Sequence, residues 1–126
     1  MSKFPHISDA EWEIMRVLWA RFPLTAADVI NALGPYHDWH PRTIKTMLGR
    51  LVKKGALGFT VDGNRYCYAP KVSRQQCIGQ ATRQFLRRIF GGDTSLALLH
   101  FAKLTDLSNE DVEQLKKLLD DKTPSS

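Results

Sequence analysis

Apolar residues recur with helical spacing in six segments of the chain. These segments cover residues 8–20, 26–33, 41–54, 73–90, 95–103 and 109–120. Two shorter segments, 57–61 and 65–68, are instead rich in aromatic and β-branched residues, and Asp62, Gly63 and Asn64 join them. Spacing of i, i+3, i+4 and i+7 is typical of an amphipathic helix, and short aromatic runs around a Gly-Asn turn are typical of a β-hairpin. The pattern predicts three helices, a hairpin and three further helices.

Four of the predicted helices begin with the same local signal. A serine or threonine is followed three residues later by an acidic or amide side chain, and this happens at Ser8, Thr25, Ser73 and Ser108. The hydroxyl can accept a hydrogen bond from the first turn, while the later side chain reaches back to the cap amide. These four residues are predicted N-caps. Gly34 is expected to end the second helix in a left-handed conformation.

The segment 41–54 is predicted to be a helix with two different sides. Its apolar positions, at helical spacing, are Ile44, Met47, Leu48, Leu51 and Val52. Pro41 suits the first turn and Gly55 suits the end of the helix. The opposite face holds Arg, Lys, Thr and Gly but no acidic residue. We expect this helix to pack by its apolar side and to present cations and hydroxyls.

Positive charge is concentrated on that helix and on the hairpin after it. The chain has 18 Lys and Arg against 13 Asp and Glu, and in residues 41–65 the only acid among the basic residues is Asp62. Residues 71–88 also carry basic residues without any acid, whereas residues 89–126 hold more acids than lysines. A local excess of positive charge favours a polyanionic partner such as nucleic acid.

Three helices followed by a hairpin, with the charge on the third helix and the hairpin, predict a winged helix-turn-helix. The expected fold is mainly α: a winged-helix DNA-binding domain over residues 1–70 and a three-helix dimerisation domain over residues 71–126. The third helix would enter the major groove, which accepts one α-helix, and the wing would touch the DNA backbone or a flanking minor groove. The predicted base-reading residues are Arg42, Thr43, Lys45 and Thr46. The predicted backbone contacts are Arg50, Lys53 and Arg65.

The segment 95–103 is apolar on nearly every side, so two neighbouring helices could not cover it. A second copy of the chain is expected to cover it, and docking on the N-terminal domain of the same chain is the alternative. The predicted dimerisation residues are Phe85, Leu86, Ile89, Leu96, Leu99, Leu115, Leu118 and Leu119. A two-fold dimer would require two half-sites on double-stranded DNA, about one helical turn or a multiple of it apart.

Five motifs along the chain together resemble one known family. They read ISDAEWEIM at 7–15, PLTA at 23–26, RTIKTML at 42–48, RLVKKG at 50–55 and YCYAP at 66–70. They are similar to those of the BlaI/MecI penicillinase-repressor family, to which the copper-responsive CopY repressors also belong, and the resemblance extends over about residues 5 to 120. It implies a winged-helix domain, a helical dimerisation domain and repression by a homodimer on an inverted-repeat operator in a bacterial promoter.

The resemblance also implies a way of releasing DNA. In the β-lactam branch of the family, a membrane sensor-protease triggers cleavage between an asparagine and a phenylalanine of the dimerisation domain. The corresponding bond here is His100–Phe101, with histidine in place of asparagine. A sensor-protease that acts directly or indirectly is therefore an expected partner. A metal-responsive repressor of the same family is an alternative, although this chain lacks the C-x-C pair of the copper branch.

Enzymatic and metal-binding functions have little support in the sequence. His37 and His40 are one residue short of the H-E-x-x-H spacing of a helical zinc site and lack its glutamate. Cys67 and Cys77 lack C-x-x-C spacing and are expected to be reduced thiols. We therefore expect no enzyme activity, no cofactor and no metal.

A winged helix that binds an acidic protein is the remaining alternative function. Such a surface usually carries aromatic or aliphatic anchors, and the polar face of segment 41–54 has none.

The chain also begins without the continuous apolar stretch of a secretory signal, and no segment reaches the length of a membrane span. A cytoplasmic protein with no membrane insertion is expected.

Overall fold

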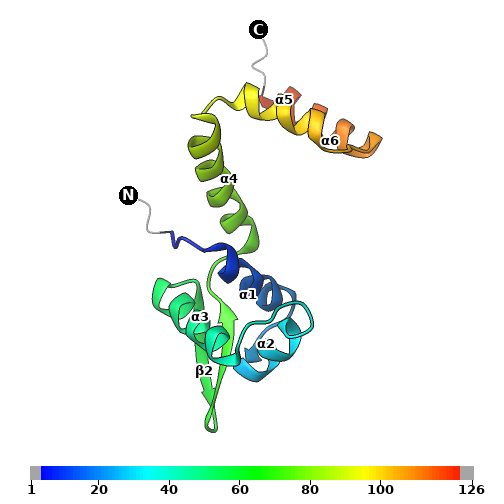
Figure 1. The fold of residues 1–126 in the computed structure, drawn as a ribbon. Coiled ribbons are helices and arrows are strands. Elements are labelled where there is room, and N and C mark those ends of the chain that lie inside the picture. The colour runs from blue at the N-terminus through cyan, green and yellow to red at the C-terminus, as the bar shows by residue number, and fades with distance from the viewer. Residues whose placement is uncertain (1–3, 123–126) are drawn as a thin grey trace. The chain divides into compact units, whose positions relative to one another are not determined.

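The computed structural model describes residues 4–122 and divides the chain into two compact units, one ending at Ala81 and the other beginning at Thr82. The elements are α1 (Asp9–Ala20), β1 (Leu24–Thr25), α2 (Ala26–Leu33), α3 (Pro41–Lys54), β2 (Leu57–Asp62), β3 (Arg65–Pro70), α4 (Arg74–Phe90), α5 (Thr94–Leu104) and α6 (Asn109–Lys122). The six predicted helices and both predicted strands are present, with ends within two residues of the prediction. Figure 1 shows α1, α2 and α3 packed together, with the hairpin extending from them as a wing. The predicted winged-helix fold is confirmed.

All four predicted N-caps are formed. At α1, the Ser8 hydroxyl accepts from the Glu11 amide at 3.2 Å, and the Ser8 amide donates to the Glu11 carboxylate at 3.0 Å. The same reciprocal pair joins Thr25 to Asp28, Ser73 to Gln76 and Ser108 to Asp111. Both partners lie within one helical turn, so the signal is local and can be recognised in the sequence.

The left-handed conformation predicted for Gly34 is wrong. Gly34 has φ −51° and ψ −44°, which is right-handed helical backbone. The chain continues to turn beyond α2, because the amides of Tyr36 and His37 both donate to the Leu33 carbonyl. The helix end is thus satisfied without positive φ at Gly34. Gly55, after α3, does adopt the left-handed conformation, with φ 88°.

A short strand that the sequence pattern did not predict adds a third member to the sheet. The strand order is β1-β3-β2 and both pairings are antiparallel. β1 pairs Leu24 with Tyr68 and Thr25 with Cys67. The hairpin turns through Gly63 and Asn64, and Gly63 has the positive φ of 66° that a tight two-residue turn requires. β1 therefore holds the wing against the start of α2.

The core of the N-terminal unit lies between α1, α2, α3 and the base of the wing. Its fully buried large side chains include Ile14, Met15, Leu18, Val29, Ile44, Leu48, Leu51 and Leu57. Cys77 of α4 packs in the same core, so this unit includes the first half of α4. The predicted domain boundary after residue 70 lies before Cys77, so the prediction assigned Cys77 to the C-terminal domain. A hydrogen bond joins α1 to the segment between β3 and α4, because the Trp19 Nε1 donates to the Val72 carbonyl at 3.0 Å.

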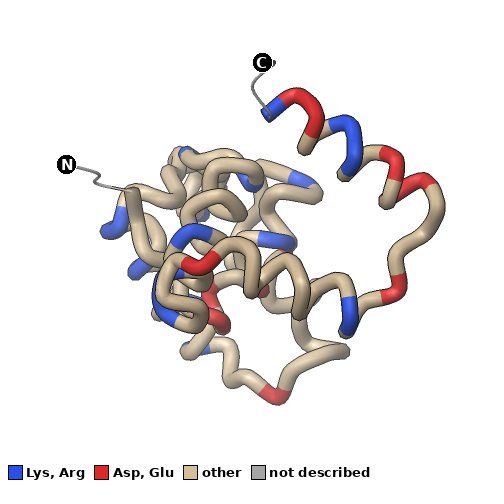
Figure 2. Tube along the Cα trace, turned by 90° about the horizontal axis from the view of Figure 1, so that it is seen from above, with Lys and Arg blue, Asp and Glu red and all other residues tan. Residues whose placement is uncertain are grey.

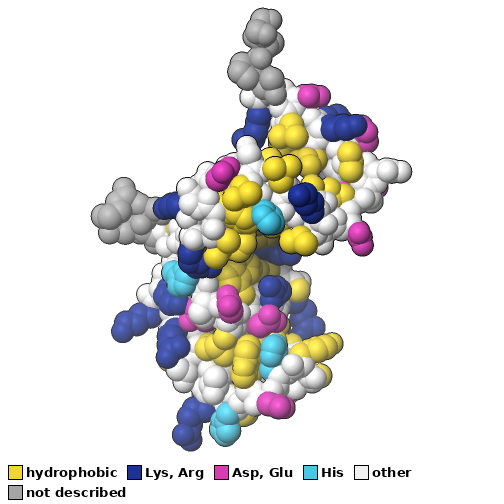
Figure 3. Space-filling view, turned by 45° about the horizontal axis from the view of Figure 1, so that its top comes forward, with side chains coloured by type: hydrophobic (Ala, Val, Ile, Leu, Met, Phe, Trp, Pro, Cys, Tyr) yellow, Lys and Arg dark blue, Asp and Glu magenta, His cyan; other side chains and the backbone are white. Residues whose placement is uncertain are grey.

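The C-terminal unit, from Thr82 onward, contains little buried surface. Among its described residues only Ala97 is buried, with 1% of its surface exposed. Figure 3 shows hydrophobic side chains at the surface of this unit, and α6 carries charges of both signs (Figure 2). Phe85, Phe90 and Phe101 form an aromatic cluster with ring centroids 5.8 to 6.4 Å apart. No helix between residues 4 and 122 combines the length and apolar character of a membrane span.

Candidate nucleic-acid interface

The apolar side of α3 faces the core, and its polar side faces outward. Ile44, Met47, Leu48 and Leu51 are buried. All seven residues predicted to contact DNA are exposed: Arg42, Thr43, Lys45, Thr46, Arg50, Lys53 and, at the start of β3, Arg65. None of the five basic residues in this set forms a salt bridge within the part of the chain that the structure describes. The surface therefore offers five cations that form no salt bridge among the described residues, beside two threonine hydroxyls.

His40 is the N-cap of α3. The His40 Nδ1 accepts a hydrogen bond from the Arg42 amide at 3.0 Å, and Pro41 occupies the first turn. His37 serves a different contact: its ring stacks on Trp39 at 4.1 Å, and its Nε2 lies 3.6 Å from the Glu13 carboxylate. The two histidines thus act in separate structural roles. Within residues 4–122, no group of three or more His, Cys, Asp or Glu could hold a metal ion.

The C-terminus of α3 is fixed to α1 by a buried ion pair. The Lys54 Nζ lies 2.5 Å from the Glu11 Oε1 and also donates to the His6 carbonyl at 2.9 Å. Glu11 is 1% exposed. Burial alone would raise the pKa of Glu11, but hydrogen bonds from Lys54 and from the Ser8 amide outweigh it and lower the pKa. Lys54 therefore stabilises the position of α3 and is not part of its outward cationic surface.

The wing carries an aromatic face next to its positive charge. The rings of Phe59 and Tyr66 stack at 4.5 Å, and Tyr68 lies 6.2 Å from Phe59. Val61 and Tyr66 are more than half exposed. These residues are predicted strand formers, and their exposure on a common surface is not evident from the sequence pattern. Their pairing across the hairpin, Phe59 with Tyr68 and Val61 with Tyr66, puts all four on one face.

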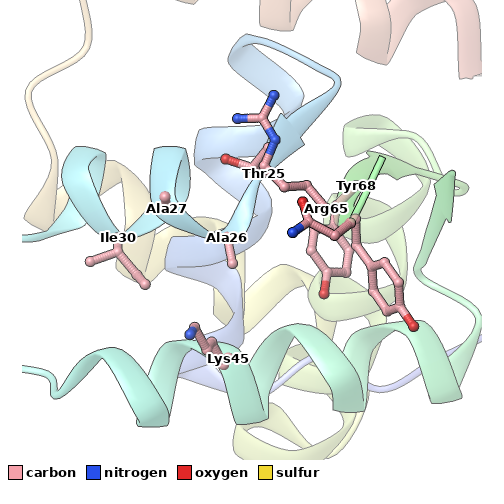
Figure 4. A pocket seen from close by; sticks show the side chains of 9 residues that line it. Thr25, Ala26, Ala27, Ile30, Lys45, Arg65 and Tyr68 are labelled. Carbon is pink, nitrogen blue, oxygen red and sulfur yellow. The ribbon is translucent and has the colours of Figure 1, made fainter. Parts of the chain in front are cut away.

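A groove of about 550 Å³ lies between α2, α3 and the wing. Figure 4 shows Ala26, Ala27 and Ile30 of α2 on one side, Arg65 and Tyr68 of β3 on another, and Lys45 of α3 below them. Thr25, Asn64 and Tyr66 complete its lining. The groove thus adds several residues to the candidate surface beyond those predicted from the sequence.

One ionisable group that lines the groove, Tyr68, and one outside the lining, Asp28, have shifted pKa values. Burial, and to a lesser degree the neighbouring Tyr66, raises the pKa of the Tyr68 phenol, which stays neutral at physiological pH. Hydrogen bonds from Thr25 lower the pKa of Asp28, and the charges of Arg21 and Arg65 contribute less. Arg65 is therefore close enough to a carboxylate to be partly compensated, whereas Lys45 forms no ion pair among the described residues.

Known proteins similar to this chain include several members of one family. The profile described as "Penicillinase repressor" matches residues 7–121. The penicillinase repressor of Bacillus licheniformis is 36% identical over 121 residues, which is 96% of this chain and 94% of that protein. The methicillin resistance regulatory protein MecI of Staphylococcus aureus is 30% identical over 121 residues, 96% of this chain and 98% of that protein.

Two solved structures are similar to about three fifths of this chain. The solution structure of the DNA-binding domain of the repressor BlaI has a TM-score of 0.54 and 43% identity, covering 59% of this chain and 90% of that one. The monomeric form of Bacillus licheniformis BlaI in complex with the blaP half-operator has a TM-score of 0.52 and 43% identity, covering 60% and 92%. The chain therefore belongs to the penicillinase repressor family, the family of BlaI and MecI.

Proposed function

We propose that this chain is a homodimeric transcriptional repressor that binds an inverted-repeat operator. The observation that carries the proposal is the outward face of α3, which presents cations and hydroxyls with no acidic residue and, among residues 4–122, no ion pair. An α-helix of 14 residues is about 21 Å long at 1.5 Å per residue, enough to lay several side chains along base edges. The half-operator complex of the related BlaI supports the same use of this fold.

The residues on this surface have different roles in the proposal. Arg42, Thr43, Lys45 and Thr46 occupy the first half of α3, where recognition helices usually meet bases. Arg50 and Lys53 follow in the second half and contact phosphates. Arg65, beside the turn of the wing, contacts the backbone or a flanking minor groove.

The dimer is proposed to form through the C-terminal unit. Its exposed apolar residues include most of those predicted for dimerisation, and Leu99 is 60% exposed. A surface of this kind is characteristic of an interface with another chain. The proposed contacts are Phe85, Leu86, Ile89, Leu96, Leu99, Leu115, Leu118 and Leu119. Two-fold symmetry then matches two recognition helices to two half-sites.

Proteolysis between His100 and Phe101 is the proposed route of release. Both residues are exposed and lie inside α5, and the Phe101 ring packs with Phe85 and Phe90. Cutting this bond would divide α5 and disrupt the aromatic cluster, which would weaken the dimer. The sensor-protease that triggers the cut, directly or indirectly, belongs to this part of the proposal.

A protein-binding winged helix is the second candidate, and the exposed aromatic face of the wing is the observation that favours it. Aromatic side chains are enriched at protein interfaces. The cationic face of α3, in contrast, offers no such anchor. Variants of Phe59 and of Lys45 therefore separate the two functions.

The full chain should be tested by selecting duplexes from a random pool. We expect enrichment of an inverted repeat whose half-sites are separated by about one helical turn or a multiple of it. Lys45→Ala should weaken binding to the selected duplex by about 5- to 150-fold, and Lys117→Ala, which removes a charge from α6, serves as the control. No enrichment, or equal losses for both variants, would contradict DNA recognition by α3.

A further inference from the structure

The groove between α2, α3 and the wing has the walls of a small-molecule site. Its volume of about 550 Å³ lies inside the range of about 300 to 1,000 Å³ found for ligand pockets. Ala26, Ala27 and Ile30 supply an aliphatic wall from α2, and Tyr66 and Tyr68 supply aromatic surface from the wing. Tyr66 is 51% exposed, so this apolar surface is open to a ligand. A ligand that fits these walls has a flat, apolar body.

The charged groups of the groove are all positive. Lys45 of α3 and Arg65 of β3 line it, and no acidic side chain does. Asp28 is close enough to act on Arg65, but it lies outside the lining, and Lys45 has no ion-pair partner among the described residues. Thr25 and Asn64 add a hydroxyl and an amide that can orient a polar group. The charge of the groove therefore selects an anion.

We propose that this groove binds a small planar aromatic carboxylate and that this ligand competes with DNA. Lys45 connects the two events, because it lines the groove and also belongs to the outward face of α3. A carboxylate paired with Lys45 removes that cation from the DNA-contacting surface, and an aromatic ring against Tyr66 obstructs the space between α3 and the wing. The competition rests on the proposed DNA binding, whereas the binding of the carboxylate does not.

The first test uses 2-naphthoate and the full chain without DNA. Titration calorimetry measures affinity, and backbone amide NMR locates the site. We expect 2-naphthoate to bind about tenfold or more tightly than the neutral 2-naphthamide, since the amide lacks the charge that pairs with Lys45. The shifted amides should include those of Ala26, Ala27, Asn64 and Tyr66. Shifts confined to residues 82–122, or equal affinity for both probes, would overturn the proposal.

Two matched variants test whether the groove itself is responsible. Ala27→Glu adds a negative charge to the lining, whereas Ala32→Glu adds the same charge to an exposed position of α2 outside it. Glutamate is acceptable in the first turn of a helix, so Ala27→Glu is expected to fold. We expect about a tenfold loss of 2-naphthoate affinity for Ala27→Glu and less than about a twofold change for Ala32→Glu. Tyr66→Ala should also weaken binding.

The second test adds the duplex obtained by selection. Saturation with this duplex should abolish the naphthoate-induced shifts, and 2-naphthoate should reduce the apparent affinity for the duplex. Simultaneous binding of both without mutual weakening would disprove the competition. A chain that binds the duplex but not 2-naphthoate would refute the groove proposal alone, and a chain that binds 2-naphthoate but enriches no duplex would refute only the proposed repressor function.

Discussion

The buried pair of Lys54 and Glu11 makes a quantitative prediction about stability. Lys54→Met removes the ammonium but keeps a flexible stem of similar length, and it leaves the Glu11 carboxylate buried with the Ser8 amide as its remaining donor. Breaking a buried pair in this way costs about 3 to 5 kcal/mol. The Lys54 side chain is 32% exposed, so water screens part of the interaction, and we expect a loss of about 2 to 4 kcal/mol in the free energy of unfolding.

Urea unfolding of the full chain, at fixed concentration, measures this loss. Fluorescence reports on the N-terminal unit, because Trp12 and Trp19 pack against its core. Lys53→Met is the matched control: Lys53 is the exposed neighbour of Lys54 on α3 and forms no salt bridge among the described residues. The control should change the unfolding free energy by less than about 0.5 kcal/mol. Equal effects of the two substitutions would refute the assigned role of the pair.

The pH dependence of the same experiment has a defined sign. In the native protein the pKa of Glu11 lies below its ordinary value of 4.5, so the pair contributes stability above pH 4.5, and this contribution is lost as the pH falls through the lowered pKa. Without Lys54, two of the interactions that lower the pKa of Glu11 are lost, so this pKa is higher than in the native chain and acidification protonates the buried carboxylate at a higher pH. The difference between native chain and Lys54→Met should therefore shrink as the pH falls from 7 to 4. A constant difference would contradict the electrostatic explanation.

Three further predictions concern DNA binding, assembly and thiol chemistry. Lys45→Ala should reduce the free energy of binding to the selected duplex by about 1 to 3 kcal/mol but change binding to random DNA little. Lys53→Ala should weaken binding to both DNAs and reduce the slope of log affinity against log salt concentration by about one. Equal losses on both DNAs for Lys45→Ala would contradict base reading. Leu99→Asp should yield monomers in sedimentation, and an unchanged dimer would place the interface elsewhere. Cys77, 2% exposed and with a pKa raised by burial, should react with a disulfide reagent at least about tenfold more slowly than Cys67, and equal rates would contradict its burial.

Features that depend on neighbouring residues could be predicted from the sequence. The capping boxes at Ser8 and Thr25 join residues three positions apart, so their hydrogen bonds are encoded within one turn. The buried face of α3 follows from its apolar periodicity, and this face determines which cations point outward. The wing turn follows from Gly63, because two-residue hairpin turns require positive φ.

Features that join distant segments could not be predicted in the same way. β1 has two residues, which are too few to show any periodicity. It is a strand because it pairs with the free edge of β3. Lys54 was counted with the positive charges of segment 41–65, yet its partner Glu11 lies 43 positions earlier in the chain. The charge of Lys54 alone therefore gave no sign of its structural role.

The order of the elements, the caps of the helices and the amphipathic character of α3 could be predicted from the sequence alone, because backbone geometry and helical spacing act over a few residues. The pairing of Glu11 with Lys54, and the groove that α2, α3 and the wing form beside Lys45, became evident only from the folded chain. Those outcomes depend on which helices and strands pack together, and packing brings into contact residues whose separation along the chain carries no local signal.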